Sequence, residues 1–275
     1  MLNYPVIDIH THLRGDIARH TKIAKESGIA AVVYMANTDP PLDNISRIKK
    51  SLLAKRNCLA LPVSAITKDL VGKQLVDVEA IKDYVVGFSD DGKYLSDLKL
   101  LAEILSKKVL VLVHCSPRYE IGVKNPELET KYIEKYLQIL KKVGGRLHIQ
   151  HVSKKGSVEA VRKAKKTGLK FSCETAPHYF TYTVGDLSAK INPPLGNYQD
   201  VIAIKRGLAN GTIDVIASDY APEPRVTGIA GFASFIPLSY GLVLSRVLSE
   251  KQLKEKLYYN PLRIIDKEKY EFNIK

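Results

Sequence analysis

The run Val6-Ile-Asp-Ile-His-Thr-His12 contains the pattern that decides the fold of this chain. An apolar, β-branched stretch passes directly into polar residues, as a buried strand of a parallel sheet does at its end. Seven further runs of this kind follow, separated by longer amphipathic stretches. The expected strands are Val6–His12, Ala30–Asn37, Cys58–Ile66, Val85–Asp91, Val109–Cys115, Arg146–Ser153, Lys170–Pro177 and Asp214–Tyr220.

The stretches between these strands have the apolar spacing of amphipathic helices. Strands that alternate with helices predict an α/β fold, and eight such units predict a (β/α)₈ TIM barrel that spans residues 1–275 as a single domain. Counting strands cannot prove closure, so an open, doubly wound sheet is the alternative. The expected helices are Asp16–Ser27, Asn44–Arg56, Val78–Lys82, Tyr94–Ser106, Asn125–Val143, Ser157–Thr167, Asp200–Ala209 and Leu238–Leu248.

Composition narrows the class of protein. No apolar run is long enough to cross a membrane and no signal peptide is recognisable, so we expect a soluble, cytoplasmic protein. Cys58, Cys115 and Cys173 each lie in an apolar run, which predicts buried free thiols. The net charge of +13 comes from lysines scattered along helices without a nucleic-acid-binding motif. A basic surface of this kind would attract a small anionic substrate.

The ends of the expected strands carry the chemistry. In a TIM barrel the active site forms at the carboxyl ends of the strands. His10 and His12 are two residues apart, so both rings project to one side of their strand. Imidazoles and carboxylates suit Zn²⁺ and related divalent ions. The remaining ionisable residues at strand ends are Asp90, Asp91, His114, His151 and Asp219. His20 and His148 lack such companions and are expected to be structural or exposed, while His178 is expected beside the site.

The same segments resemble motifs of the dihydroorotase branch of the amidohydrolase superfamily, and they occur in the family order. Asp8–Arg14 is similar to the D-x-H-x-H-x-R opening, and Gly87–Gly92 to the segment in which an Asp bridges two metals. The other similar segments are Met35–Pro41 (M-P-N-T-x-P), His114-Cys115, His151–Ser153 (H-V-S), Cys173–His178 (C-E-x-T-P-H), Lys190–Leu195 (K-V-N-P-P-L) and Asp214–Asp219.

The resemblance implies a role for each matching residue. His10 and His12 would bind one metal, His114 and His151 another, and Asp91 rather than Asp90 would bridge them. Asp219 would be both a ligand and the proton shuttle. The carboxylate of the substrate would be bound by Arg14 and Asn37, and its ring by Asn192. The implied cofactor is one or two Zn²⁺ ions, and the implied reaction is the reversible cyclisation of N-carbamoyl-L-aspartate to L-dihydroorotate.

The chain departs from the family pattern after Asp219. Tyr220 and Glu223 stand where the family has histidines, and a glutamate beside a dianionic substrate would repel it. The expected barrel also has no residues for the β-sandwich of many relatives. Two alternatives therefore stay open: a weak or silent homologue that binds aspartate transcarbamoylase, and a related hydantoinase-like or allantoinase-like enzyme. Apolar barrel surface left uncovered would favour a homo-oligomer.

Overall fold

The computed structural model describes residues 2–93, 95–115, 127–187, 190–222 and 228–266. Its strands form two parallel groups. The first group contains β1 (Val6–Thr11), β2 (Ile29–Tyr34) and β3 (Leu59–Pro62) in that order. The second contains β4 (Leu110–Val113), β5 (Arg146–Ile149), β6 (Ser172–Thr175) and β7 (Val215–Ile216), also in chain order.

Single backbone bridges join the two groups at both edges. Phe88 forms parallel bridges with Ser64 and with Val111, and Thr11 forms one with Tyr220. The strand expected at Val85–Asp91 is therefore present only as one bridging position. Bridges at both edges complete the ring that a (β/α)₈ barrel requires and that an open sheet lacks.

Gly87 allows this close approach of the two groups. A Cβ atom added there would lie 2.6 Å from the carbonyl oxygen of Leu110, which is the oxygen that accepts from the Phe88 amide at 2.9 Å. Any larger residue would push these backbones apart and open the ring at this point.

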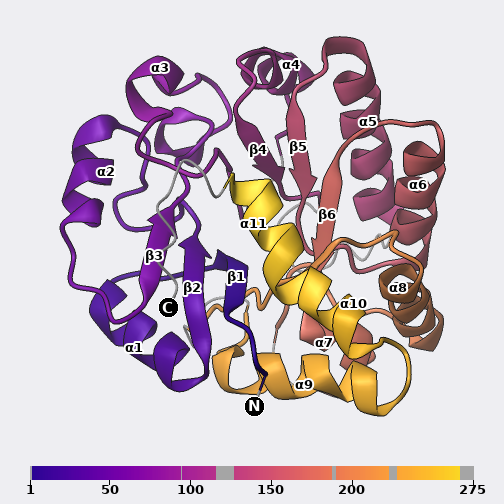
Figure 1. The fold of residues 1–275 in the computed structure, drawn as a ribbon. Coiled ribbons are helices and arrows are strands. Elements are labelled where there is room, and N and C mark those ends of the chain that lie inside the picture. Colours follow the sequence, from indigo (N-terminus) through magenta and orange to yellow (C-terminus); the bar gives the residue numbers. More distant parts are fainter. Residues whose placement is uncertain (1, 94, 116–126, 188–189, 223–227, 267–275) are drawn as a thin grey trace.

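Helices surround the strands (Figure 1). The side chain of Asp16 caps α1 by accepting from the Arg19 amide, and Gly28 follows this helix with a φ of 82°. Sequence placed the start of α9 after Pro237, a residue that usually breaks helices. The helix instead begins at Phe232, because Phe232 and Phe235 are buried in the core. The helices are α1 (Ile17–Glu26), α2 (Ile45–Leu52), α3 (Val78–Ile81), α4 (Leu98–Ser106), α5 (Glu127–Val143), α6 (Lys155–Lys166), α7 (Pro177–Thr181), α8 (Tyr198–Ala209) and α9 (Phe232–Leu244), with a 3₁₀ turn η1 (Lys68–Leu70).

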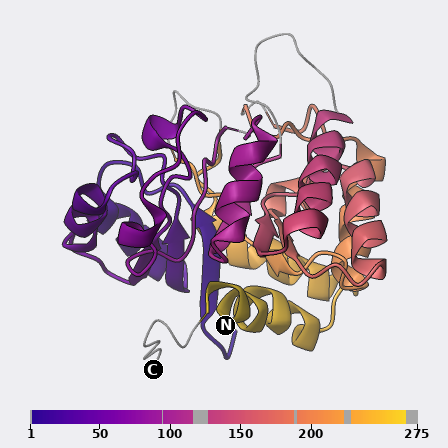
Figure 2. The same cartoon turned by 90° about the horizontal axis from the view of Figure 1, so that it is seen from above.

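Three short C-terminal elements close one end of the barrel. They are α10 (Glu250–Lys254), the π-helical turn η2 (Glu255–Tyr259) and α11 (Asn260–Ile265). Leu262 and Ile265 of α11 pack against the interior residues Ile7, Ile9 and Val215. Figure 1 shows α11 crossing the strands, and Figure 2 shows the N-terminus beside these helices. Sequence reasoning placed no element here.

Cys58, Cys115 and Cys173 are unpaired, as expected. Cys115 and Cys173 are buried, but Cys58 is only partly buried, so the prediction of a buried thiol was wrong there. Within the described ranges, no helix is long and apolar enough to cross a membrane.

Lys256, on η2, makes the free energy of unfolding vary with pH in the alkaline range. Its ammonium is buried and donates to the carbonyl oxygen of Ile213 at 2.7 Å, and burial lowers its pKa to about 8. Between that pKa and its usual value of 10.5 the unfolded chain binds more protons than the folded one, so stability from this group rises with pH.

We expect Lys256→Met to remove this rise. Between pH 7.5 and pH 10, the free energy of unfolding should increase by about 2 kcal/mol more for the parent than for the variant. Urea denaturation of both proteins at several pH values measures the difference, in which other titrating groups cancel. A constant difference would contradict the assignment.

Candidate metal centre

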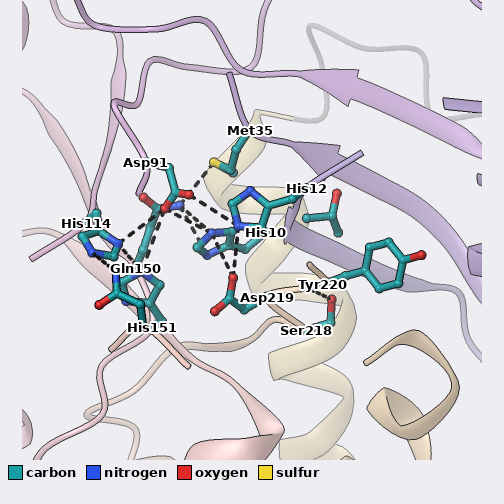
Figure 3. A network of polar contacts seen from close by, with 12 residues as sticks. His10, His12, Met35, Asp91, His114, Gln150, His151, Ser218, Asp219 and Tyr220 are labelled. Atoms are coloured by element: carbon teal, nitrogen blue, oxygen red, sulfur yellow. Dashed lines mark hydrogen bonds and ion pairs between the residues drawn. The ribbon is translucent and has the colours of Figure 1, made fainter. Parts of the chain in front are cut away.

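Six candidate ligands predicted from sequence meet in one place. In Figure 3 their imidazoles and carboxylates point toward one another. All six are buried, and each lies at or just beyond the carboxyl end of a strand or of the Phe88 bridge. They are His10, His12, Asp91, His114, His151 and Asp219.

Asp91 lies at the centre of this cluster. Its Oδ1 is 3.3 Å from His10 Nε2, 3.6 Å from His114 Nδ1 and 3.9 Å from His151 Nε2, while its Oδ2 is 3.4 Å from His12 Nε2. Burial alone would raise the pKa of Asp91, but His10 and His12 hold it well below its usual value. The carboxylate therefore stays ionised between two pairs of imidazoles.

Asp90 is turned away from the cluster. Its carboxylate accepts from the amides of Ile66 at 2.8 Å and Thr67 at 3.0 Å, and from the Thr67 hydroxyl. The structure thus brings Asp91, and not its neighbour, to the histidines, in line with the preference drawn from the motif.

The donor atoms fit a divalent metal. Two sets, His10–Asp91–His151 and His10–His12–Asp219, each offer ligand atoms within 4.8 Å of one another. His114 Nδ1 and His151 Nε2 face each other at only 2.6 Å, and Asp91 Oδ1 is buried without a hydrogen-bond partner among the described atoms. Lone pairs that converge in this way suit a cation with nitrogen and oxygen ligands.

Glu174 orients His10 from behind, and sequence reasoning missed it. Its Oε1 accepts from His10 Nδ1 at 2.5 Å, which leaves Nε2 facing Asp91 and Asp219. His148 Nε2 lies 3.1 Å from the other oxygen of Glu174. Burial would raise the pKa of Glu174, but the two imidazoles lower it to about 2. A carboxylate that holds a ligating histidine in this way fixes both its tautomer and its direction.

A cavity of about 390 Å³ opens onto the cluster. The three residues predicted to bind substrate, Arg14, Asn37 and Asn192, line its wall together with His12 and Asp219. Asn37 Oδ1 accepts from His12 Nδ1 at 2.9 Å, so Asn37 also orients a candidate ligand. Asn192 Nδ2 lies 3.3 Å from His114 Nε2, and its Oδ1 is buried without a partner among the described atoms.

The three other histidines are all buried. His148 bonds Glu174, and His20 lies between the hydroxyl of Tyr220 and the carbonyl of Arg14. His178 Nε2 is 4.0 Å from Asp219 Oδ2, beside the cluster as expected. Glu223 lies outside the described residues.

No protein-family model matches the chain. Solved structures of similar fold include L-hydantoinase from Arthrobacter aurescens, with a TM-score of 0.80, 20% identity and coverage of 94% of this chain and 70% of that one. Dihydroorotase from Saccharomyces cerevisiae in complex with 5-fluoroorotic acid has a TM-score of 0.78, 16% identity and coverage of 95% and 84%. The chain therefore has the barrel fold of these cyclic amidohydrolases.

The sequences of curated relatives identify the family to which the chain belongs. The dihydroorotase of Trichlorobacter lovleyi is 34% identical over 94% of this chain and 72% of its own length. That of Aquifex aeolicus is 31% identical over the same shares of the two chains. The protein belongs to the dihydroorotase family.

Proposed function

We propose that this protein is a dihydroorotase, which interconverts L-dihydroorotate and N-carbamoyl-L-aspartate in pyrimidine synthesis, with Zn²⁺ as its metal. One observation carries the proposal. A single cavity joins candidate metal ligands to Arg14, a cation suited to a substrate carboxylate. A hydantoin or allantoin ring carries no carboxylate, so Arg14 favours dihydroorotate.

The candidate ligands divide between two cations. His10 and His12 would hold one, His114 and His151 the other, with Asp91 between them and Asp219 as a further ligand. Bound cations would polarise the ring carbonyl and lower the pKa of an attacking water. Asp91 is suited to a shared position because both of its oxygens face imidazoles.

Asp219 is the proposed proton carrier. Its Oδ1 is 3.2 Å from His12 Nε2, and the residue lines the cavity. During hydrolysis a C–O bond forms, the ring C–N bond breaks, and Asp219 moves a proton from the water to the departing nitrogen. Ring closure runs the same steps in reverse.

Arg14, Asn37 and Asn192 are the proposed substrate-binding residues. The guanidinium of Arg14 can bind a carboxylate as a bidentate fork, and its Nε donates to the Asn37 carbonyl at 3.1 Å, which fixes its direction. Asn192 would contact the ring through the amide oxygen that has no partner among the described atoms.

A hydrolysis assay with added Zn²⁺, Co²⁺ or Mn²⁺ tests the proposal. We expect turnover of L-dihydroorotate that stops when the metal is removed by a chelator and returns when it is restored. Dihydrouracil has a similar ring without the carboxylate and should be a much poorer substrate. Preference for dihydrouracil or hydantoin would indicate a related cyclic amidohydrolase. No turnover by metal-loaded protein would contradict the proposal and favour a silent homologue.

We further propose that the protein is cytoplasmic and acts either as a homo-oligomer or together with aspartate transcarbamoylase. An exposed apolar face on α9 supports association, since this helix carries no charged residue and Leu244 is 74% exposed. Light scattering with and without aspartate transcarbamoylase distinguishes the two assemblies, and a monomer in both would contradict them.

A further inference from the structure

His20 connects two parts of the cavity wall that are far apart in the sequence. Its ring is buried in α1, its Nε2 is 3.0 Å from the carbonyl oxygen of Arg14, and its Nδ1 is 3.0 Å from the hydroxyl of Tyr220. We propose that His20 and Tyr220 are positioning residues that fix Arg14 at a set distance from Asp219. The inference rests on the proposed function, in which Arg14 binds the carboxylate of the substrate and Asp219 carries the proton at its reacting end.

The Arg14 carbonyl fixes the direction of one hydrogen bond, and for a neutral His20 ring it fixes the direction of the other as well. A carbonyl oxygen only accepts, so His20 Nε2 must carry the proton and donate it to Arg14. The other nitrogen of the neutral ring then accepts, and the Tyr220 hydroxyl donates to it. A residue without one donor and one acceptor in these places cannot replace His20.

Tyr220 is itself rigidly held. Its ring stacks on Phe232 of α9, with the centroids 3.6 Å apart and the planes within 4°. Its carbonyl accepts from the His12 amide at 2.8 Å, and its own amide donates to Ser218 Oγ at 3.0 Å. The position of the hydroxyl is therefore well defined, and its hydrogen bond to His20 holds α1 against it.

The same residue holds Asp219 in place. Asp219 directly precedes Tyr220 and has a φ of 51°, a left-handed conformation that residues other than glycine, asparagine and aspartate rarely adopt. At the other end of the His20 contact, Arg14 lies between β1 and the Asp16 cap of α1. Its carbonyl oxygen therefore belongs to the loop that connects this strand to the helix. One histidine therefore connects the backbone of the carboxylate-binding residue to the strand end that carries the proton carrier.

The expected signature is weaker binding with unchanged chemistry. Arg14 binds a carboxylate that does not react, so its displacement weakens ground state and transition state alike. His20→Leu and Tyr220→Phe should each raise KM for dihydroorotate about tenfold, with kcat within about twofold and metal content unchanged. The double variant should be no worse than either single one, because both remove the same connection.

Two further variants separate positioning from general stability. His20→Gln offers one donor and one acceptor and should restore most of the affinity. Thr21→Val removes a neighbouring buried hydroxyl that bonds to Ile17 and Ala18, away from the cavity. It should lower the melting temperature and leave KM unchanged. An equal rise of KM in Thr21→Val, or no recovery in His20→Gln, would overturn the inference.

Calorimetry with orotate, an unreactive ring carboxylate, keeps the inference separate from the proposed function. Weaker orotate binding in His20→Leu and Tyr220→Phe than in the zinc-loaded parent supports the inference, even where the parent turns over no dihydroorotate. Parental affinity for orotate in both variants overturns it, even where the parent is an active dihydroorotase.

Discussion

Replacing Asp219 by Asn is expected to abolish turnover and leave the fold intact. The amide cannot carry the proton between water and the ring nitrogen, so kcat should fall by about 10³-fold. The fold should survive because Asn tolerates the left-handed backbone that this position requires, with its φ of 51°. Steady-state assays give kcat, and circular dichroism gives the melting temperature.

Asp214→Asn is the matched control for this variant. Asp214 lies just before β7, at its opposite end, and pairs with Lys165 at 2.6 Å, so the same change in charge there should spare catalysis. Because Asp219 is also a candidate ligand, metal content is measured in both variants. If Asp219→Asn, supplied with saturating metal, keeps activity within tenfold of the parent, Asp219 is not the proton carrier.

The strand ends were predictable because their signal is local. His10 and His12 are two residues apart on one strand, and each further candidate ligand follows an apolar run of its own. Alternation of short and long apolar patterns then placed all six side chains on one face of a barrel. The choice of Asp91 over Asp90 needed the resemblance, since both carboxylates are buried and only their contacts separate them.

The contacts behind the cluster were not predictable, because they join residues far apart in the sequence. Glu174 meets His10 across 164 positions, and His20 meets Tyr220 across 200. No periodic pattern contains such a pair. The α11 helix escaped notice for a related reason: Leu262 and Ile265 form too short an apolar pattern to indicate that they close a barrel.

Glu174→Gln is expected to weaken metal binding by about 10- to 100-fold. The amide is nearly the same size and keeps both hydrogen bonds: its oxygen accepts from His10 Nδ1, and its NH₂ donates to His148 Nε2. His148 can adjust because its Nδ1 can then donate to the Ser172 hydroxyl, 2.8 Å away. Only the negative charge behind His10 is lost, and with it the basicity that this charge lends to Nε2.

Competition with a chromophoric chelator measures the loss directly, without reference to turnover. Ser172→Ala is the control, because it removes a hydroxyl from the same chain of contacts and leaves the Glu174 charge in place. We expect it to retain metal as the parent does. If Glu174→Gln also resists the chelator as the parent does, the carboxylate contributes only packing and hydrogen bonds, and the affinity of the centre must come from the six candidate ligands themselves.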